Sequence, residues 1–102
     1  MSKYENVLDR KPDLKVEKPK MFSVTILNDD YSTFTTVEEI CINVFNMDPD
    51  TASATTIEVD LCGKALVGVY TFDVAETKQC EAMNIAKSRE EPLMLVLEPV
   101  ND

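Results

Sequence analysis

Three consecutive polar residues, Asn28, Asp29 and Asp30, follow an apolar segment and could bind a cation. An amide oxygen and two carboxylates that a fixed backbone presents in one direction can together accept hydrogen bonds from an ammonium group. The same triplet also suits an ordinary polar turn, because Asn and Asp side chains readily hydrogen-bond to nearby backbone. Local chemistry therefore leaves both an amine-binding site and a plain turn open.

Patterns typical of catalysis and metal binding are missing from the sequence. The chain has no histidine, which excludes Ser-His-Asp and Cys-His catalysis and the common histidine-containing zinc sites. A calcium-loop start at Asp48 lacks the glycine and final glutamate of such loops, and Gly63-Lys64 lacks the remainder of a phosphate-binding loop. We expect no metal, no cofactor and no catalytic residue. An enzyme would need a carboxylate or lysine mechanism, for which Asp29, Asp30 and Asp60 could form a carboxylate cluster capable of acid/base work.

Length and charge limit the class of protein. The 102 residues, 44% hydrophobic and 28% charged, suffice for one domain with one core. The net charge of -9 is uneven, because residues 1–20 hold six Lys/Arg against four Asp/Glu, whereas residues 21–102 hold four against fifteen. An acidic body argues against nucleic-acid binding, which depends on basic residues that neutralise phosphates. No apolar run reaches the roughly 18 residues that span a bilayer and no signal pattern is present, so we expect a cytoplasmic protein with no membrane partner.

Periodicity and capping residues give the order of the elements that must position these side chains. Residues 1–20, rich in charge and proline, are expected to form a flexible arm before a domain over 21–102. Apolar patterns predict strands over 21–27, 65–70 and 93–97, and the glycine at 68 suggests close approach of a neighbouring backbone. Caps at Thr36, Asp48 and Asp73 predict helices that end near Asn46, Cys62 and Ser88. The β-α-α-β-α-β order indicates an α+β fold, with helices packed on one face of a small three-stranded sheet.

Several short motifs occur in one register between Met21 and Pro99. They are Asn28-Asp29-Asp30-Tyr31, Cys62-Gly63-Lys64-Ala65, Gly68-Val69-Tyr70-Thr71, Asp73-Val74-Ala75-Glu76-Thr77-Lys78 and Pro92-Leu93. In this order and spacing the chain resembles the ClpS family of adaptors for Clp-type AAA+ proteases. The resemblance implies a non-enzymatic adaptor that binds the free N-terminal Leu, Phe, Tyr or Trp of N-degron polypeptides and delivers them to a Clp unfoldase.

The resemblance also implies roles for residues of the site. The substrate α-amine would be bound by Asn28 and Asp29, together with the residue at position 60. A hydrophobic pocket for the N-terminal side chain would be lined by Asp30, Ser32, Phe34, Val37, Thr56, Val59 and Leu93. A free α-amine has a pKa of about 7.7 to 8.0, so it is mostly cationic near neutral pH and binds a carboxylate with charge assistance. The apolar members of this set equally suit an ordinary hydrophobic core.

Three positions depart from the family's pattern. Asp60 stands where the family has a histidine that helps to bind the amine, and a second carboxylate beside Asp29 strengthens attraction for a cation while adding repulsion in the empty site. We therefore expect retained but altered amine binding. Phe34 and Thr56 both stand where methionine is usual, so the pocket gains rigid bulk at one position and loses volume at the other.

The resemblance implies a partner surface as well. Tyr70, Asp73, Thr77 and Lys78 match the positions through which the family contacts the N-terminal domain of a ClpA- or ClpC-type unfoldase, although the same residues suit helix capping and a solvated face. The arm over 1–20 resembles in placement the extension that the family uses during delivery. An alternative function is a divergent regulator that binds the unfoldase N-domain and alters substrate choice, with weak or changed N-degron recognition.

Overall fold

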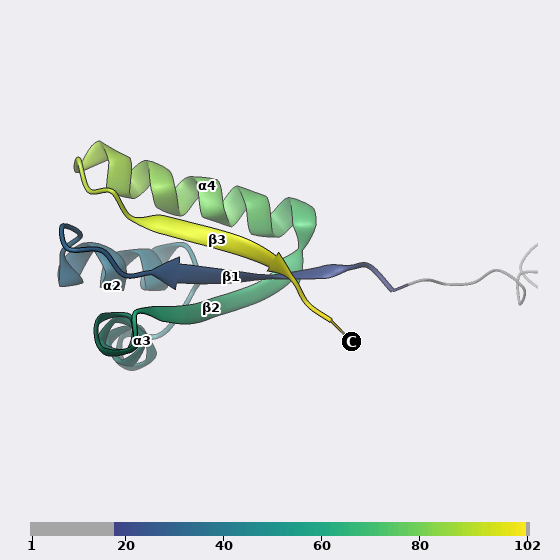
Figure 1. The fold of residues 1–102 in the computed structure, drawn as a ribbon, viewed down its shortest axis with the longest axis horizontal. Coiled ribbons are helices and arrows are strands. Elements are labelled where there is room, and N and C mark those ends of the chain that lie inside the picture. Colours follow the sequence, from purple (N-terminus) through teal and green to yellow (C-terminus); the bar gives the residue numbers. More distant parts are fainter. Residues whose placement is uncertain (1–17, 102) are drawn as a thin grey trace, which may run out of the picture.

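Six elements make up the fold, in the predicted order β-α-α-β-α-β (Figure 1). The computed structural model describes residues 18–101. The elements are β1 (Met21–Leu27), α2 (Phe34–Asn43), α3 (Pro49–Cys62), β2 (Lys64–Thr71), α4 (Phe72–Ser88) and β3 (Met94–Pro99). Most of the predicted flexible arm, residues 1–17, lies outside the described residues. No helix within the described range is long and apolar enough to cross a membrane.

β1 is the central strand of a three-stranded antiparallel sheet, with β2 and β3 on either side. Leu27, at the end of β1, pairs with Lys64 and Met94, which begin β2 and β3. The backbone amide of Asn28 extends this pairing, since it donates to the carbonyl of Gly63 at 2.9 Å. Three segments that are far apart in the sequence therefore meet at one end of the sheet, which we call the Asn28 end.

The hydrophobic core lies on one face of the sheet. Val24 and Ile26 of β1 are completely buried, and so is Ile40 of α2. On the opposite face, Leu66 and Met94 are 57% and 49% exposed. Figure 1 shows α4 running along β3, with α3 beside β2. This difference between the two faces confirms the predicted α+β fold with helices on one face of the sheet.

The first helix begins three residues earlier than predicted. Thr33 is its N-cap, and the Thr33 hydroxyl accepts a hydrogen bond from the amide of Thr36 at 3.2 Å. Glu39 does not close a capping box, because its carboxylate pairs with Arg89, just beyond the end of α4, at 2.9 Å. The predicted cap at Thr36 is therefore wrong, and the helix also ends earlier, at Asn43.

Of the other two predicted N-caps, the one of α3 is confirmed and the one of α4 is wrong. Asp48 caps α3 as predicted, since its carboxylate accepts from the Thr51 amide at 3.2 Å, and Gly63 ends the helix with a φ of 90° that favours glycine. The N-cap of α4 is Thr71, which makes no side-chain capping bond. Asp73 is therefore not the cap. It lies in the first helical turn, where the helix dipole favours a carboxylate.

Gly68 of β2 lies against an aromatic side chain. A Cβ atom at this position would collide with the ring and hydroxyl of Tyr70. The Tyr70 ring in turn lies 6.4 Å from the ring of Phe45, centroid to centroid. The close approach that the glycine predicted exists, but the neighbour is a side chain and not the backbone.

Candidate functional site

The side chain of Asp29 is fixed by its own loop directly after β1. Its Oδ1 atom accepts hydrogen bonds from the backbone amides of Tyr31 and Ser32, both at 2.7 Å. Its Oδ2 atom and the hydroxyl of Ser32 are buried and have no hydrogen-bond partner among the described residues. A buried acceptor without a donor is costly, so the free Oδ2 atom is the feature of this loop that calls for a ligand.

The charge of Asp29 follows from the same contacts. Burial, the largest single influence, raises the pKa of the carboxyl group. The Ser32 hydroxyl, which lies near the carboxylate without the geometry of a hydrogen bond, and the amides of Tyr31 and Ser32 together lower the pKa by more. The pKa therefore lies below its ordinary value of 3.8. Asp29 is an anion at neutral pH, and its free oxygen can accept a charge-assisted hydrogen bond from an ammonium group.

The other two predicted amine ligands lie near the same end of the sheet. Asn28 is exposed and directly follows β1, and Asp60 is exposed in the last turn of α3. The hydrogen bond from the Asn28 amide to Gly63, three residues after Asp60, joins these two segments. The fold thus joins the loop after β1 to the end of α3, two segments that are more than thirty positions apart in the sequence.

The predicted pocket residues divide into exposed and buried members. Ser32 is half-buried, Asp30 is exposed, and Phe34, the first residue of α2, is 46% exposed. The remaining four are buried members of α2, α3 and the segment before β3: Val37, Thr56, Val59 and Leu93. Three of these buried residues belong to the hydrophobic core, as their apolar character also suggested. The hydroxyl of Thr56 is satisfied inside α3, where it donates to the Ala52 carbonyl at 2.7 Å.

The predicted partner surface carries internal contacts of its own. The Nζ atom of Lys78 donates to the Val44 carbonyl at 2.7 Å and lies 5.4 Å from the centre of the Tyr70 ring. Burial raises the pKa of Tyr70. Thr77 donates its hydroxyl hydrogen bond to the Asp73 carbonyl at 3.0 Å. The hydrogen bond of Lys78 thus joins α4 to Val44, the C-cap of α2, while Asp73 and Thr77 remain on the surface.

A hydrogen-bond network that the sequence did not suggest joins the beginning of α2, which holds Phe34, to the segment before β3, which holds Leu93. The Glu91 carboxylate accepts from the Thr33 amide and from the Thr36 hydroxyl, both at 2.9 Å. Arg89 donates to Thr36 at 3.1 Å and to both oxygens of Glu39 at 2.9 Å. Thr33, three residues before Thr36, was the only local signal for this network in the sequence. Its charged partners, Glu91 and Arg89, lie at least fifty residues away from α2 along the chain.

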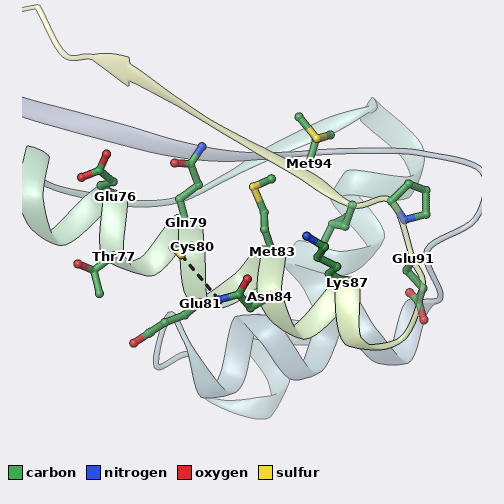
Figure 2. Close-up of a pocket in the computed structure, with 12 residues that line it drawn as sticks. Glu76, Thr77, Gln79, Cys80, Glu81, Met83, Asn84, Lys87, Glu91 and Met94 are labelled. Atoms are coloured by element: carbon green, nitrogen blue, oxygen red, sulfur yellow. Dashed lines mark hydrogen bonds between the residues drawn. The ribbon is translucent and has the colours of Figure 1, made fainter.

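A groove of about 940 Å³ lies between α4 and the beginning of β3 (Figure 2). Its walls include Gln79, Met83, Asn84, Lys87, Leu93 and Met94. The Gln79 side chain donates to the Leu95 carbonyl at 2.7 Å and so occupies part of the edge of β3. Neither Asp29 nor Asp60 lines this groove, so it is not the candidate amine site.

Comparisons with known proteins place this geometry in context. The family model ClpS, ATP-dependent Clp protease adaptor protein ClpS, matches residues 17–96. The chain is similar to the ATP-dependent Clp protease adapter protein ClpS of Acetivibrio thermocellus, with 39% identity over 95 residues that cover 93% of this chain and 96% of the relative. Similarity to the ClpS of Clostridium acetobutylicum is 45% identity over 83 residues, 81% of this chain and 82% of the relative. The structure of Agrobacterium tumefaciens ClpS2 bound to L-phenylalaninamide matches with a TM-score of 0.78 and 37% identity, over 81% of this chain and 100% of that chain.

Proposed function

Because the chain belongs to the ClpS family of ATP-dependent Clp protease adaptors, we propose that it binds the free hydrophobic N-terminal residue of N-degron polypeptides and delivers them to a Clp AAA+ unfoldase. The observation that carries the proposal is the Asp29 carboxylate, with one oxygen fixed by two amides and the other buried and free. The similar structure of ClpS2 holds L-phenylalaninamide, a ligand with a free α-amine and an apolar side chain.

The proposed selectivity follows from the chemistry of the N-terminus. A free α-amine is cationic at neutral pH and supplies the donor that Asp29 Oδ2 lacks, whereas the amide of an internal residue carries no charge. The attached apolar side chain would lie among Phe34, Val37 and Leu93. An N-terminus that fits one requirement and fails the other loses affinity, because it leaves either a buried carboxylate or an apolar surface without a partner.

The test is fluorescence anisotropy with labelled peptides that begin with Leu, Phe, Tyr or Trp, each paired with the same peptide acetylated at its N-terminus. We expect binding of the free peptides and little binding of the acetylated ones. Equal affinity for free and acetylated peptides would contradict the proposal. If the two kinds of peptide bind equally and the chain still binds the unfoldase N-domain, that outcome would support the alternative function, a divergent regulator of the protease.

The pH dependence of peptide binding provides a further prediction. Binding needs an ionised Asp29 and a protonated α-amine, and the pKa of Asp29 lies below 3.8. Affinity should therefore be level between about pH 5 and 7 and fall above the amine pKa of about 7.7 to 8.0, approaching tenfold per pH unit. Anisotropy titrations across this range measure the profile. A midpoint near pH 6.5 or a rise in alkaline solution would contradict it.

Replacing Asp60 by histidine tests the most unusual residue of the proposed site. Asp60 is exposed, so its attraction for the ammonium group is screened by solvent and is worth about 0.2 to 1 kcal/mol. We expect Asp60→His to weaken binding of a Leu peptide roughly two- to fivefold at pH 7.5 and low salt, and the difference to shrink as salt is added. Tighter binding by Asp60→His would show instead that the natural aspartate has weakened the site.

The unfoldase contact is the second half of the proposed function. We place it on Tyr70, Asp73, Thr77 and Lys78, and the partner is the N-terminal domain of a ClpA- or ClpC-type unfoldase. Asp73 and Thr77 offer exposed polar groups on the first turns of α4. The hydrogen bond from Lys78 to Val44 holds that helix in a fixed position relative to α2, which would orient the proposed surface.

A further inference from the structure

We infer that Glu91 is a positioning residue that sets the selectivity of the N-terminal residue pocket, an inference that rests on the proposed function. Its carboxylate joins the segment before β3 to the beginning of α2 through hydrogen bonds to the Thr33 amide and the Thr36 hydroxyl, both at 2.9 Å. Figure 2 shows Glu91 in the connection between α4 and β3. We call Glu91, Thr33 and Thr36 the brace.

The brace fixes two residues that are proposed to line the pocket. Phe34 directly follows Thr33, and Leu93 comes two residues after Glu91. These two side chains belong to segments that are otherwise separated by most of the chain. A hydrogen-bonded link so close to both of them limits how far Phe34 and Leu93 can move apart.

The brace is itself supported from a third segment. Arg89, just after α4, donates to the Thr36 hydroxyl at 3.1 Å and to both carboxylate oxygens of Glu39 at 2.9 Å. Thr36 is almost completely buried, so its hydroxyl has few alternative partners. The carboxylate of Glu91 also lies at the N-terminus of α2, where the helix dipole favours a negative charge. Several contacts therefore hold Glu91 in one geometry.

A fixed spacing between Phe34 and Leu93 favours some N-terminal side chains over others. Attraction between apolar atoms falls steeply when a gap of less than about 1 Å opens between them. When the spacing widens, a short side chain such as leucine loses contacts on one side, whereas a phenylalanine ring can fill the extra space. Loss of the brace should therefore weaken binding of Leu more than binding of Phe.

The experiment compares Glu91→Ala and Glu91→Gln with the wild type, using anisotropy with Leu and Phe peptides. Loss of a helix-capping interaction of this kind lowers the equilibrium constant for forming that helix end about fivefold. We expect Glu91→Ala to weaken Leu binding about fivefold and Phe binding about twofold or less, so that the Leu-to-Phe preference shifts. Glu91→Gln should retain most of the preference, because its oxygen can accept from the Thr33 amide while its nitrogen donates to a Thr36 hydroxyl that has turned to accept. Thr36→Val, which removes the hydroxyl but keeps the volume, should repeat the shift without changing Glu91.

Glu90 provides the matched control, because it is the neighbouring glutamate and is exposed. Glu90→Ala and Glu90→Gln make the same changes of charge and should leave both affinities within about twofold of the wild type. If Glu91→Ala is folded and binds both peptides with unchanged affinity, or weakens both equally, the inference is overturned while the proposed function stands. If the wild-type chain binds neither peptide, the proposed function fails and this inference fails with it.

Discussion

Replacing Asp29 by asparagine is expected to weaken binding of a free N-terminal Leu or Phe peptide roughly 10- to 100-fold, more than either Asp60→His or Glu91→Ala. A hydrogen bond to a charged group is worth about 1.5 to 3 kcal/mol, which corresponds to this range. The backbone amides of Tyr31 and Ser32 hold one oxygen of the side chain in place. In the variant they would keep the amide oxygen, and the amide nitrogen would then present donors to the ammonium group.

The measurement is an anisotropy titration of the variant against free and acetylated peptides. Asp50→Asn is the matched control, since Asp50 is an exposed aspartate in the first turn of α3, at the opposite end of that helix from Asp60. It should bind the free peptide like the wild type. Circular dichroism should show that both variants are folded. Binding by Asp29→Asn at wild-type affinity would mean that Asp29 does not receive the amine, and the proposed site would have to be abandoned.

Truncation of Ile26 to alanine is expected to lower the free energy of unfolding by about 2 to 5 kcal/mol. Ile26 lies in the central strand, is completely buried, and pairs with Ala65 and Leu95 on either side. Movement of one neighbour cannot fill the space that the side chain leaves, so a cavity should remain. Domains of this size are typically stable by about 5 to 15 kcal/mol, so the variant would lose a large share of its stability.

Urea denaturation followed by circular dichroism measures this change. Leu66→Ala is the control, because it removes an aliphatic side chain of the same size from the open face of the sheet, where Leu66 is 57% exposed. Its cost should stay below about 1 kcal/mol. Similar costs for the two variants would show that the two faces of the sheet contribute equally, which a one-sided core does not allow.

Local sequence patterns predicted helix ends correctly where neighbouring residues alone determine the cap. The Asp48 cap and the Gly63 end of α3 are confirmed, because each depends on residues within one turn of the helix. The start of α2 was misplaced for the opposite reason. Thr36 and Glu39 have the spacing of a capping box, but Glu39 pairs with Arg89, and Thr33 takes the cap instead. A distant partner outweighed the local pattern.

Gly68 illustrates the same limit within a strand. A glycine among apolar strand residues indicates that a neighbouring group lies close to the backbone at that position, and such a group is present. The sequence could not tell that the neighbour is the Tyr70 ring, two residues further along the same strand, because side-chain directions in a strand depend on what packs around it. In this fold the Phe45 ring and the Lys78 ammonium group lie beside the Tyr70 ring.

The family, the order of the elements and the chemical types available to the site all follow from the amino-acid sequence. Motif spacing and the order of the elements can be read from local patterns, although a distant partner can shift a helix start, as Arg89 does for α2. Only the structure shows that one oxygen of Asp29 is buried and free, and only it shows the tertiary contact between Glu91 and Thr33, which lie 58 residues apart in the sequence. Such contacts form when β3 pairs with β1 and brings the segment before β3 to the Asn28 end. The proposed amine site thus depends both on a local loop, which fixes Asp29, and on segments that no local pattern connects to that loop.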